Sequence, residues 1–208
     1  GHTSEKAIPI GELHMLLNKD PQSEKLRRTQ AIANLLFQFC GMPFSDLAHL
    51  EKSNLERGLL KYNRTKTGTP MSIEVLESAQ NAIGGLYNKS DARSSGYPDY
   101  LFRILSGAYK RNEEGAYREY QSALRRFNNE LKSLSRKLRL HSPVTSYTLR
   151  HSWATTAKYR GVPIEMISES LGHKSIKTTQ IYLKGFELEE RTKVNKLNYS
   201  YVCNFKML

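Results

Sequence analysis

The sequence predicts a mainly α-helical fold with one small antiparallel β-sheet, on the basis of three observations. Apolar side chains recur at three- and four-residue steps along much of the 208-residue chain, which is typical of amphipathic helices. Between Leu60 and Val75, by contrast, apolar and polar residues alternate on either side of the turn sequence TKTGTP, which indicates a β-hairpin. The hydrophobic fraction of 38% and the mean hydropathy of -0.59 fit a soluble domain with a modest core.

The N-terminal half begins with a helix predicted in SEKLRRTQAIANLLFQFCGM. Its apolar residues fall on one face, and Gly41 ends the pattern. That apolar face consists of Leu26, Ile32, Leu35, Leu36 and Phe39. A short helical turn follows in DLAHLEKSNL, and after the hairpin EVLESAQNAIGGL returns to helix. The next stretch is rich in Gly, Ser, Asn and Asp, so a flexible insertion is expected near residues 84–100.

The C-terminal half is predicted to be helical throughout. A long basic amphipathic helix spans residues 117–139, with apolar residues at three- and four-residue steps. Residues 147–160 form the next helix, with Ser146 as its N-cap. The sequence PIEMISESLG predicts a helix with proline near its start and Gly172 just past its end. A last short helix begins at Ser175.

Charge is the strongest global signal in the sequence. The chain has 32 Lys and Arg against 20 Asp and Glu, a formal net charge of +12. Such an excess predicts a polyanionic partner, in the first place nucleic acid, and the alternative is a basic surface with no partner. The polar face of helix 117–139 could lie along DNA or simply face solvent. Its candidate DNA-binding residues are Arg125, Arg126, Lys132 and Arg136.

Several classes of protein are disfavoured. No apolar run approaches the roughly 20 residues that a membrane-spanning helix needs, and there is no N-terminal signal pattern. Cys40 and Cys203 do not occur at metal-binding spacing and are expected to be free thiols. We therefore expect a cytoplasmic protein, bacterial and associated with the nucleoid, that uses no metal and no other cofactor.

Four residues stand out as candidates for chemistry, although each alone has an ordinary structural explanation. Together they match a pattern in TSYTLRHSWATTAKYRGVPIEMISESLGHKSIKTTQIYL. This stretch resembles the C-terminal signature of the tyrosine recombinase (phage-integrase-type) family: a histidine-x-x-arginine box, then LGH, then a tyrosine nine residues later. Arg150 occupies the arginine position, His173 the LGH position and Tyr182 the tyrosine position. The hairpin RTKTGTPMSI resembles the family's β-turn lysine motif and places Lys66 there.

The resemblance implies a catalytic domain that breaks and rejoins DNA without metal or ATP. The tyrosine hydroxyl would attack a phosphodiester to give a 3′-phosphotyrosine and a free 5′-hydroxyl. Because a phenol with a pKa near 10 is a poor nucleophile, Arg150 and His173 would stabilise the charged transition state, and Lys66 would protonate the leaving oxygen. Arg64, Lys174 and Lys177 are further candidate DNA-binding residues. His151 and Trp153 are expected to serve in helix packing.

Two positions depart from the family pattern. Tyr147 stands where the box has its histidine, and we treat it as a candidate catalytic residue. Aligning GMPFSDL with the family's Gly-Leu-Arg-x-Ser-Glu-Leu puts Pro43 where the first catalytic arginine belongs. This form resembles integrases of conjugative transposons. Arg64 and Arg28 are candidate substitutes, between which the sequence does not choose.

These observations leave three functions open. The first is an active site-specific recombinase, which in this family acts on double-stranded DNA as a tetramer on two duplexes. The second is an impaired relative that only binds DNA, and the third is a nicking-closing activity of the type IB topoisomerase kind. The expected organisation is a linker over residues 1–25, a catalytic domain over residues 26–186, and a tail over residues 187–208 that contacts a neighbouring protomer.

Overall fold

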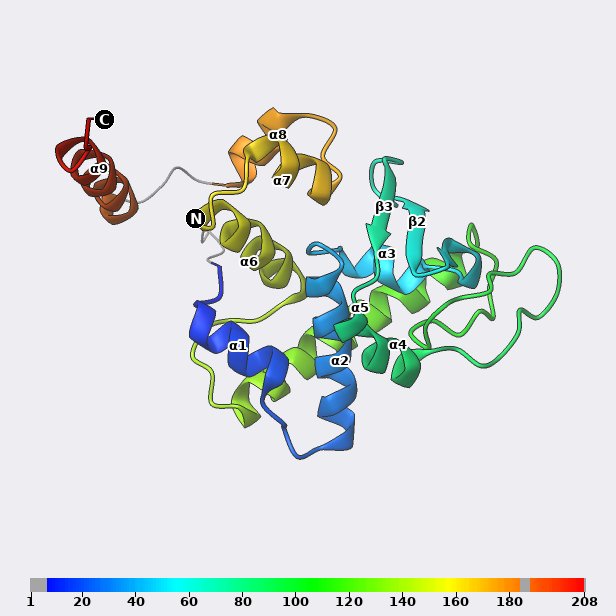
Figure 1. The fold of residues 1–208 in the computed structure, drawn as a ribbon. Helices are drawn as coiled ribbons and strands as arrows, with labels where there is room; N and C mark the ends of the chain where they lie inside the picture. The colour runs from blue at the N-terminus through cyan, green and yellow to red at the C-terminus, as the bar shows by residue number, and fades with distance from the viewer. Residues whose placement is uncertain (1–6, 184–187, 208) are drawn as a thin grey trace.

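The computed structural model describes residues 7–183 and 188–207, apart from the side chain of Glu189. Most of these residues are helical, and a three-stranded antiparallel sheet lies at one side of the helical body (Figure 1). The predicted class, mainly α with a small antiparallel sheet, is confirmed. The boundary expected after residue 186 and the first six residues of the expected linker lie outside the described residues.

Helix α2 (Glu24–Gln38) lies at the centre of the fold. It begins at the N-cap Ser23, whose hydroxyl accepts a hydrogen bond from the backbone N–H of Leu26. Leu35 and Leu36 on its apolar face are completely buried. The helices that pack around it are α1 (Ile10–Asn18), α4 (Gln80–Leu86), α5 (Glu114–Lys137) and α6 (Ser146–Tyr159).

Helix α1 lies within the segment that the sequence assigned to a linker. Leu13 and Leu16 of this helix are buried in the main core. The side-chain amide of Gln30 on α2 donates hydrogen bonds to the carbonyls of Leu16 and Lys19, which joins the end of α1 to α2. Residues 10–18 are therefore part of the folded body and not of a linker.

The sheet has the strand order β1 (Leu55–Glu56), β2 (Leu59–Asn63) and β3 (Pro70–Glu74). In the β2–β3 pair, Leu60 lies opposite Ile73, and both side chains are buried. This confirms the hairpin predicted from the alternating pattern. Helix α3 (Phe44–His49) and the 3-10 turn Lys52–Asn54 precede the sheet in the sequence. The 3-10 turn Glu77–Ala79 follows it.

The irregular residues 87–113 connect α4 to α5 and include residues 87–100 of the expected insertion, whose first residues, 84–86, instead end α4. Their later part joins the core, because Tyr100, Leu101 and Phe102 are buried. Single β-bridges connect Tyr100 to Glu51 and Phe102 to Tyr87. Helix α5, predicted over residues 117–139, then runs from Glu114 to Lys137 and buries the expected apolar stripe.

Helices α6, α7 (Ile164–Leu171) and α8 (Ile176–Tyr182) surround a second, smaller apolar cluster. The predicted end of α7 is confirmed, since Gly172 follows it in the left-handed conformation with φ +71°. The predicted N-cap of α6 was wrong by one residue. Thr145 takes that position because it forms a capping box, in which Thr145 and Thr148 each accept the other's backbone N–H.

The last helix, α9 (Leu188–Cys203), lies apart from the other helices (Figure 1). Val194, Leu197 and Tyr201 recur at three- and four-residue steps on it, so they share one face. All three are more than half exposed. No helix among residues 7–183 and 188–207 is long and apolar enough to cross a membrane.

Candidate active site

Arg150 is a buried arginine held between two parts of the chain that are distant in sequence. It lies on α6 and is only 7% exposed. Its Nη1 donates to the carbonyl of Gly41 at 2.9 Å, and its Nη2 donates to the carbonyl of Leu171 at 2.7 Å. Burial lowers the pKa of Arg150, and the nearby charge of Arg64 acts in the same direction. A guanidinium has five N–H groups, so the two carbonyls leave others for a ligand.

Gly41 explains why α2 can approach α6 so closely. Its φ is +67°, and a Cβ at this position would lie 3.0 Å from the Cβ of Trp153 and 3.3 Å from the Cα of Arg150. Only a residue without a side chain fits both the left-handed backbone and this contact. The helix-breaking glycine of the sequence therefore also brings a carbonyl within reach of Arg150.

Gly172 has the same two properties at the end of α7. A Cβ on it would lie 2.4 Å from Cδ of Arg64 and 2.7 Å from Sδ of Met71, and its φ is +71°. The stem of Arg64 therefore lies directly over this glycine. The carbonyl of Gly172 in turn accepts a hydrogen bond from Nη1 of Arg64 at 3.3 Å.

Gly172→Ala is expected to destabilise the protein more than Gly161→Ala, a matched control. Gly161 also has a left-handed backbone, with φ +82°, but a Cβ there would meet nothing within 4 Å. Both changes cost about 1–2 kcal/mol of backbone strain. Gly172→Ala should cost about 1–3 kcal/mol more because of overpacking. Urea denaturation measures both, and equal free energies of unfolding would contradict the close packing of Arg64 on Gly172.

His173 follows Gly172 and is positioned by α8. Its Nδ1 lies 2.7 Å from Oγ1 of Thr179, which is completely buried. Burial lowers the pKa of His173 to about 4. The positive charges of Arg150, Arg64 and Lys66 act in the same direction. The imidazole is therefore neutral at pH 7 in the unliganded protein.

Tyr182, the last residue of α8, lies among three rings that contact it edge-on. Their centroids are 5.1 Å away for His151, 5.8 Å for His173 and 5.9 Å for Tyr147. The phenol oxygen of Tyr182 is buried, and its charge when ionised would be stabilised by Arg150. The structure thus brings together Tyr182, Arg150 and His173, three of the candidate residues from the sequence, with Tyr147 at the solvent-exposed edge.

The β2–β3 hairpin turn contributes Lys66 and Arg64. Lys66 is exposed in the turn, whereas Arg64, two residues earlier, is only 7% exposed. Asp46 of α3 positions this turn: its Oδ1 accepts the backbone N–H of Thr65 at 2.9 Å. Its Oδ2 lies 3.6 Å from Nε of Arg64.

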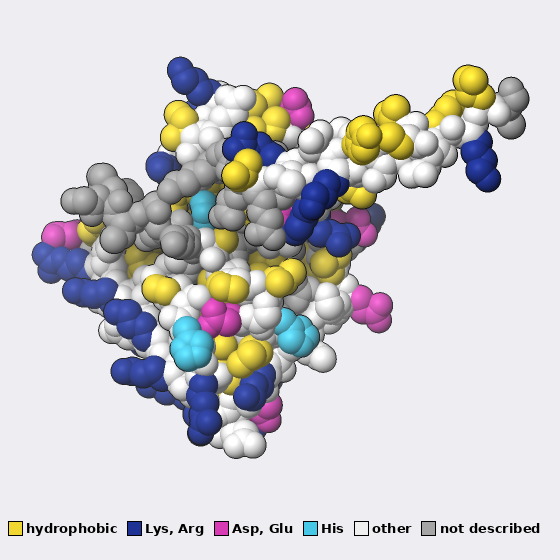
Figure 2. All heavy atoms as spheres, turned by 90° about the vertical axis from the view of Figure 1, so that its left-hand side faces the viewer, with side chains coloured by type: hydrophobic (Ala, Val, Ile, Leu, Met, Phe, Trp, Pro, Cys, Tyr) yellow, Lys and Arg dark blue, Asp and Glu magenta, His cyan; other side chains and the backbone are white. Residues whose placement is uncertain are grey.

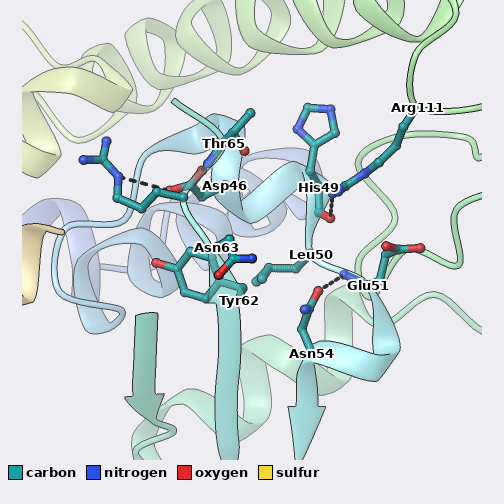
Figure 3. A pocket seen from close by; sticks show the side chains of 10 residues that line it. Asp46, His49, Leu50, Glu51, Asn54, Tyr62, Asn63, Thr65 and Arg111 are labelled. Carbon is teal, nitrogen blue, oxygen red and sulfur yellow. Dashed lines mark hydrogen bonds and ion pairs between the residues drawn. The ribbon is translucent and has the colours of Figure 1, made fainter. Parts of the chain in front are cut away.

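A pocket of about 430 Å³ lies on the side of the hairpin where Asp46 is found (Figure 3). Asp46 and Thr65 line it at one end and Arg111 at the other. Arg111 donates to the backbone carbonyl of His49 across the pocket wall. Arg64 also lines this pocket, so it lies between the pocket and the residues around Tyr182.

The other candidate DNA-binding residues are exposed but do not lie together. Lys174 and Lys177 flank the start of α8, next to His173. The four basic candidates on α5 belong to a helix that packs on α2 and α3, and none of the contacts described above for Tyr182, Arg150 and His173 involves it. They are Arg125, Arg126, Lys132 and Arg136, all exposed.

Three residues near the site were not recognised from the sequence as functional candidates. His151 was expected to serve in packing, but its ring contacts Tyr182. Its spacing of four residues from Tyr147 places both side chains on one helical face, and this spacing could have identified it from the sequence. Thr179, whose hydroxyl contacts His173, gave no signal. Asp46 is visible only through the similarity of GMPFSDL to the family motif. The described residues contain no group of three or more His, Cys, Asp or Glu that could hold a metal ion.

Comparisons with known proteins agree with this geometry. Residues 10–188 match the Phage integrase family. The chain is 29% identical over 191 residues to a probable integrase/recombinase protein of Methanocaldococcus jannaschii, covering 88% of this chain and 54% of that protein. It is 30% identical over 187 residues to the tyrosine recombinase XerD of Halalkalibacterium halodurans, covering 85% and 56%. The chain thus spans about half the length of these curated relatives.

Solved structures show the same fold. A crystal structure of XerA recombinase superposes with a TM-score of 0.63 at 21% identity, covering 100% of this chain and 66% of that one. The Tn1549 transposon integrase in complex with a circular intermediate DNA superposes with a TM-score of 0.64 at 15% identity, covering 92% and 66%. The family match covers most of the chain, and it includes the hairpin, Arg150, His173 and Tyr182 in the expected order. The chain therefore belongs to the phage integrase family, that of the tyrosine recombinases, and has the fold of their catalytic domain.

Proposed function

We propose that this chain is the catalytic domain of a site-specific DNA recombinase in which Tyr182 is the nucleophile. The observation that carries the proposal is the convergence of Tyr182 of α8 with a buried Arg150 of α6 and a neutral His173 of the α7–α8 connection, within a basic protein. Lys and Arg side chains gather along one edge of the face shown in Figure 2, as expected for a protein that binds a polyanion.

The proposed reaction is a transesterification at phosphorus. The phenol of Tyr182 gives up its proton to water, its oxygen forms a bond to the phosphorus, and the bond from phosphorus to the 5′-oxygen breaks. The products are a 3′-phosphotyrosine and a DNA end with a free 5′-hydroxyl, so the bond energy is kept for rejoining. Lys66, exposed at the tip of the hairpin, donates the proton that the leaving 5′-oxygen requires.

Arg150 and His173 stabilise the transition state in this mechanism. The N–H groups of Arg150 that do not bind carbonyls donate to the non-bridging oxygens. The mechanism uses the tautomer in which the hydroxyl of Thr179, 2.7 Å away, donates to Nδ1 of His173. The imidazole proton is then on Nε2 and donates to the same phosphate. Because both groups are fixed before DNA binds, little reorganisation is needed during the reaction.

A suicide substrate tests the proposal. A DNA duplex carrying the recombination site and a nick near the scissile phosphate loses the short 5′-hydroxyl strand after cleavage, so the covalent intermediate accumulates. We expect an adduct that survives denaturing electrophoresis, with the nucleotide remnant on the peptide that contains Tyr182 after proteolysis. Salt-sensitive DNA binding without any adduct would instead identify a protein that only binds DNA. Relaxation of supercoiled plasmid without recombinant product would identify a nicking-closing enzyme.

We also propose that recombination takes place in a tetramer joined through the C-terminal helix. The exposed apolar residues of α9 support this, because large apolar side chains gathered on a surface often mark a protein–protein contact. They are Leu188, Val194, Leu197, Tyr199, Tyr201 and Val202. Figure 2 shows this helix projecting from the body with hydrophobic side chains along it. In a symmetric assembly on two duplexes, a neighbouring copy of the chain would cover these apolar residues. The mass of the trapped complex checks the assembly: four chains on two duplexes agree with it, and one chain per duplex contradicts it.

A further inference from the structure

The phosphate site described so far contains one arginine from the helices, and a second is missing at the position where the family has it. Pro43 stands there as the N-cap of α3, with φ -62°. Proline has neither a charge nor an N–H, so it can donate nothing to a phosphate. We propose that Arg64 of the β2–β3 hairpin is the second catalytic arginine and binds the scissile phosphate together with Arg150. This inference rests on the proposed function.

Consecutive carbonyls hold the two arginines beside each other. Arg150 donates to the carbonyl of Leu171 and Arg64 to that of Gly172, and the next residue is His173. Both guanidinium groups therefore lie at the C-terminal end of α7, close to the backbone of His173. Their proximity also shows in the pKa of Arg150, which the charge of Arg64 lowers. An arginine from the β2–β3 turn thus reaches the place where Arg150 of α6 binds the end of α7.

The balance of charge around this pair favours an anion. Both side chains are 7% exposed, and two like charges buried together are costly unless a negative group compensates them. Asp46 is the carboxylate that contacts Arg64, at 3.6 Å, and it also accepts the backbone N–H of Thr65. One carboxylate does not neutralise two guanidinium groups. A phosphodiester between them would supply the second negative charge in the geometry that planar guanidinium groups bind well.

Asp46 and Gly172 explain how the hairpin holds Arg64 in this position. Asp46 contacts both the backbone of the turn and Nε of Arg64, while Gly172 gives space for the stem. Lys66 lies two residues further along the same turn. The hairpin would therefore deliver both the second phosphate-binding cation and the proton donor, so that one rigid element sets their relative positions.

Arg28, the other candidate from the sequence, is engaged elsewhere. Its Nη2 donates to the carbonyl of Arg103, and the charged groups that influence its pKa are Glu130, Arg103 and Arg126. It lines a different, small pocket together with Arg126. None of these contacts is with Arg150, His173 or Tyr182, so Arg28 serves as a matched control.

The experiment compares adduct formation by the unaltered chain, Arg64→Met and Arg28→Met on two suicide substrates. One has an ordinary scissile phosphate. In the other, a methyl group replaces one non-bridging oxygen, which makes the reacting group neutral. Methionine keeps an unbranched stem over Gly172 but removes the charge. Urea denaturation of each variant reports whether the fold is retained.

We expect Arg64→Met to slow adduct formation on the phosphate by about 100- to 1,000-fold, as for the loss of one transition-state donor. On the neutral methylphosphonate the loss should be about tenfold or less, because there is less charge to stabilise. Arg28→Met should react like the unaltered chain on both substrates. The contrast between substrates identifies a group that acts on the charge of the phosphate, which a purely structural arginine would not produce.

Four results would overturn the assignment while leaving the proposed function intact. The first two are an unaltered rate in Arg64→Met and an equal loss on both substrates. The others are no reaction of any chain with the methylphosphonate, and a loss in Arg28→Met as large as in Arg64→Met. Absence of the adduct from the unaltered chain on the ordinary phosphate would overturn the proposed function itself, and this inference with it.

Discussion

Tyr182→Phe is expected to abolish the covalent adduct while leaving the fold and the affinity for DNA nearly unchanged. The substitution removes only the oxygen that would bond to phosphorus. The ring keeps its edge-on contacts with His151, His173 and Tyr147. We expect the free energy of unfolding to change by no more than about 1.5 kcal/mol, the net value of one hydrogen bond.

The measurement combines the suicide substrate with a DNA-binding titration at fixed salt. Tyr159→Phe is the matched control, since Tyr159 lies on α6, is 43% exposed and is not part of the described site. It should form the adduct at the unaltered rate. An adduct that persists in Tyr182→Phe would show that another residue is the nucleophile. Loss of DNA binding together with the adduct would show that Tyr182 serves mainly to hold the fold.

Arg150→Met is expected to affect both catalysis and stability, in contrast to Tyr182→Phe. Adduct formation should fall by at least about 1,000-fold, because a charged donor to the phosphate is lost. The fold should lose stability as well, since the carbonyls of Gly41 and Leu171 would both lose their donor inside the protein. Each unpaired buried carbonyl costs about 1–3 kcal/mol. Relief of the repulsion with Arg64 offsets part of this, so a net loss of about 2–4 kcal/mol is expected.

Arg150→Lys separates the two effects. Lysine keeps one charge for the phosphate, but its single ammonium cannot bridge two carbonyls as the planar guanidinium does. It should therefore recover part of the adduct rate and little of the stability. Adduct assays and urea denaturation of the three proteins provide the comparison. Unaltered stability of Arg150→Met would contradict the role of the two carbonyls in joining α2, α6 and α7.

Local pattern was sufficient for much of the fold. The helical spacing of the apolar residues predicted α2, α5 and α6, and the alternation around TKTGTP predicted the β2–β3 hairpin with Leu60 and Ile73 buried. Helix α1 was missed although its apolar residues Leu13, Leu16 and Leu17 recur at helical steps. So short a segment is not a stable helix by itself, and its packing against α2 stabilises it. The N-cap of α6 was displaced by one residue because Ser146 and Thr145 are both good caps, and the reciprocal hydrogen bonds with Thr148 decide between them.

The sequence by itself identified the candidate groups of the site, because Tyr182, Arg150, His173 and Lys66 match the family pattern in residue type, order and spacing. What only the tertiary structure decided is which further groups stand beside them. Arg64 and Arg28 are equally basic in the sequence, yet one lies against the carbonyl of Gly172 and the other against that of Arg103. The reason is physical: spacing along the chain sets which residues share a helix or strand, whereas the position of a strand residue beside a distant helix depends on how the elements pack. Because Gly172 has no side chain, the stem of Arg64 can pack directly on it. Arg64 and Arg150 therefore bind the adjacent carbonyls of Gly172 and Leu171.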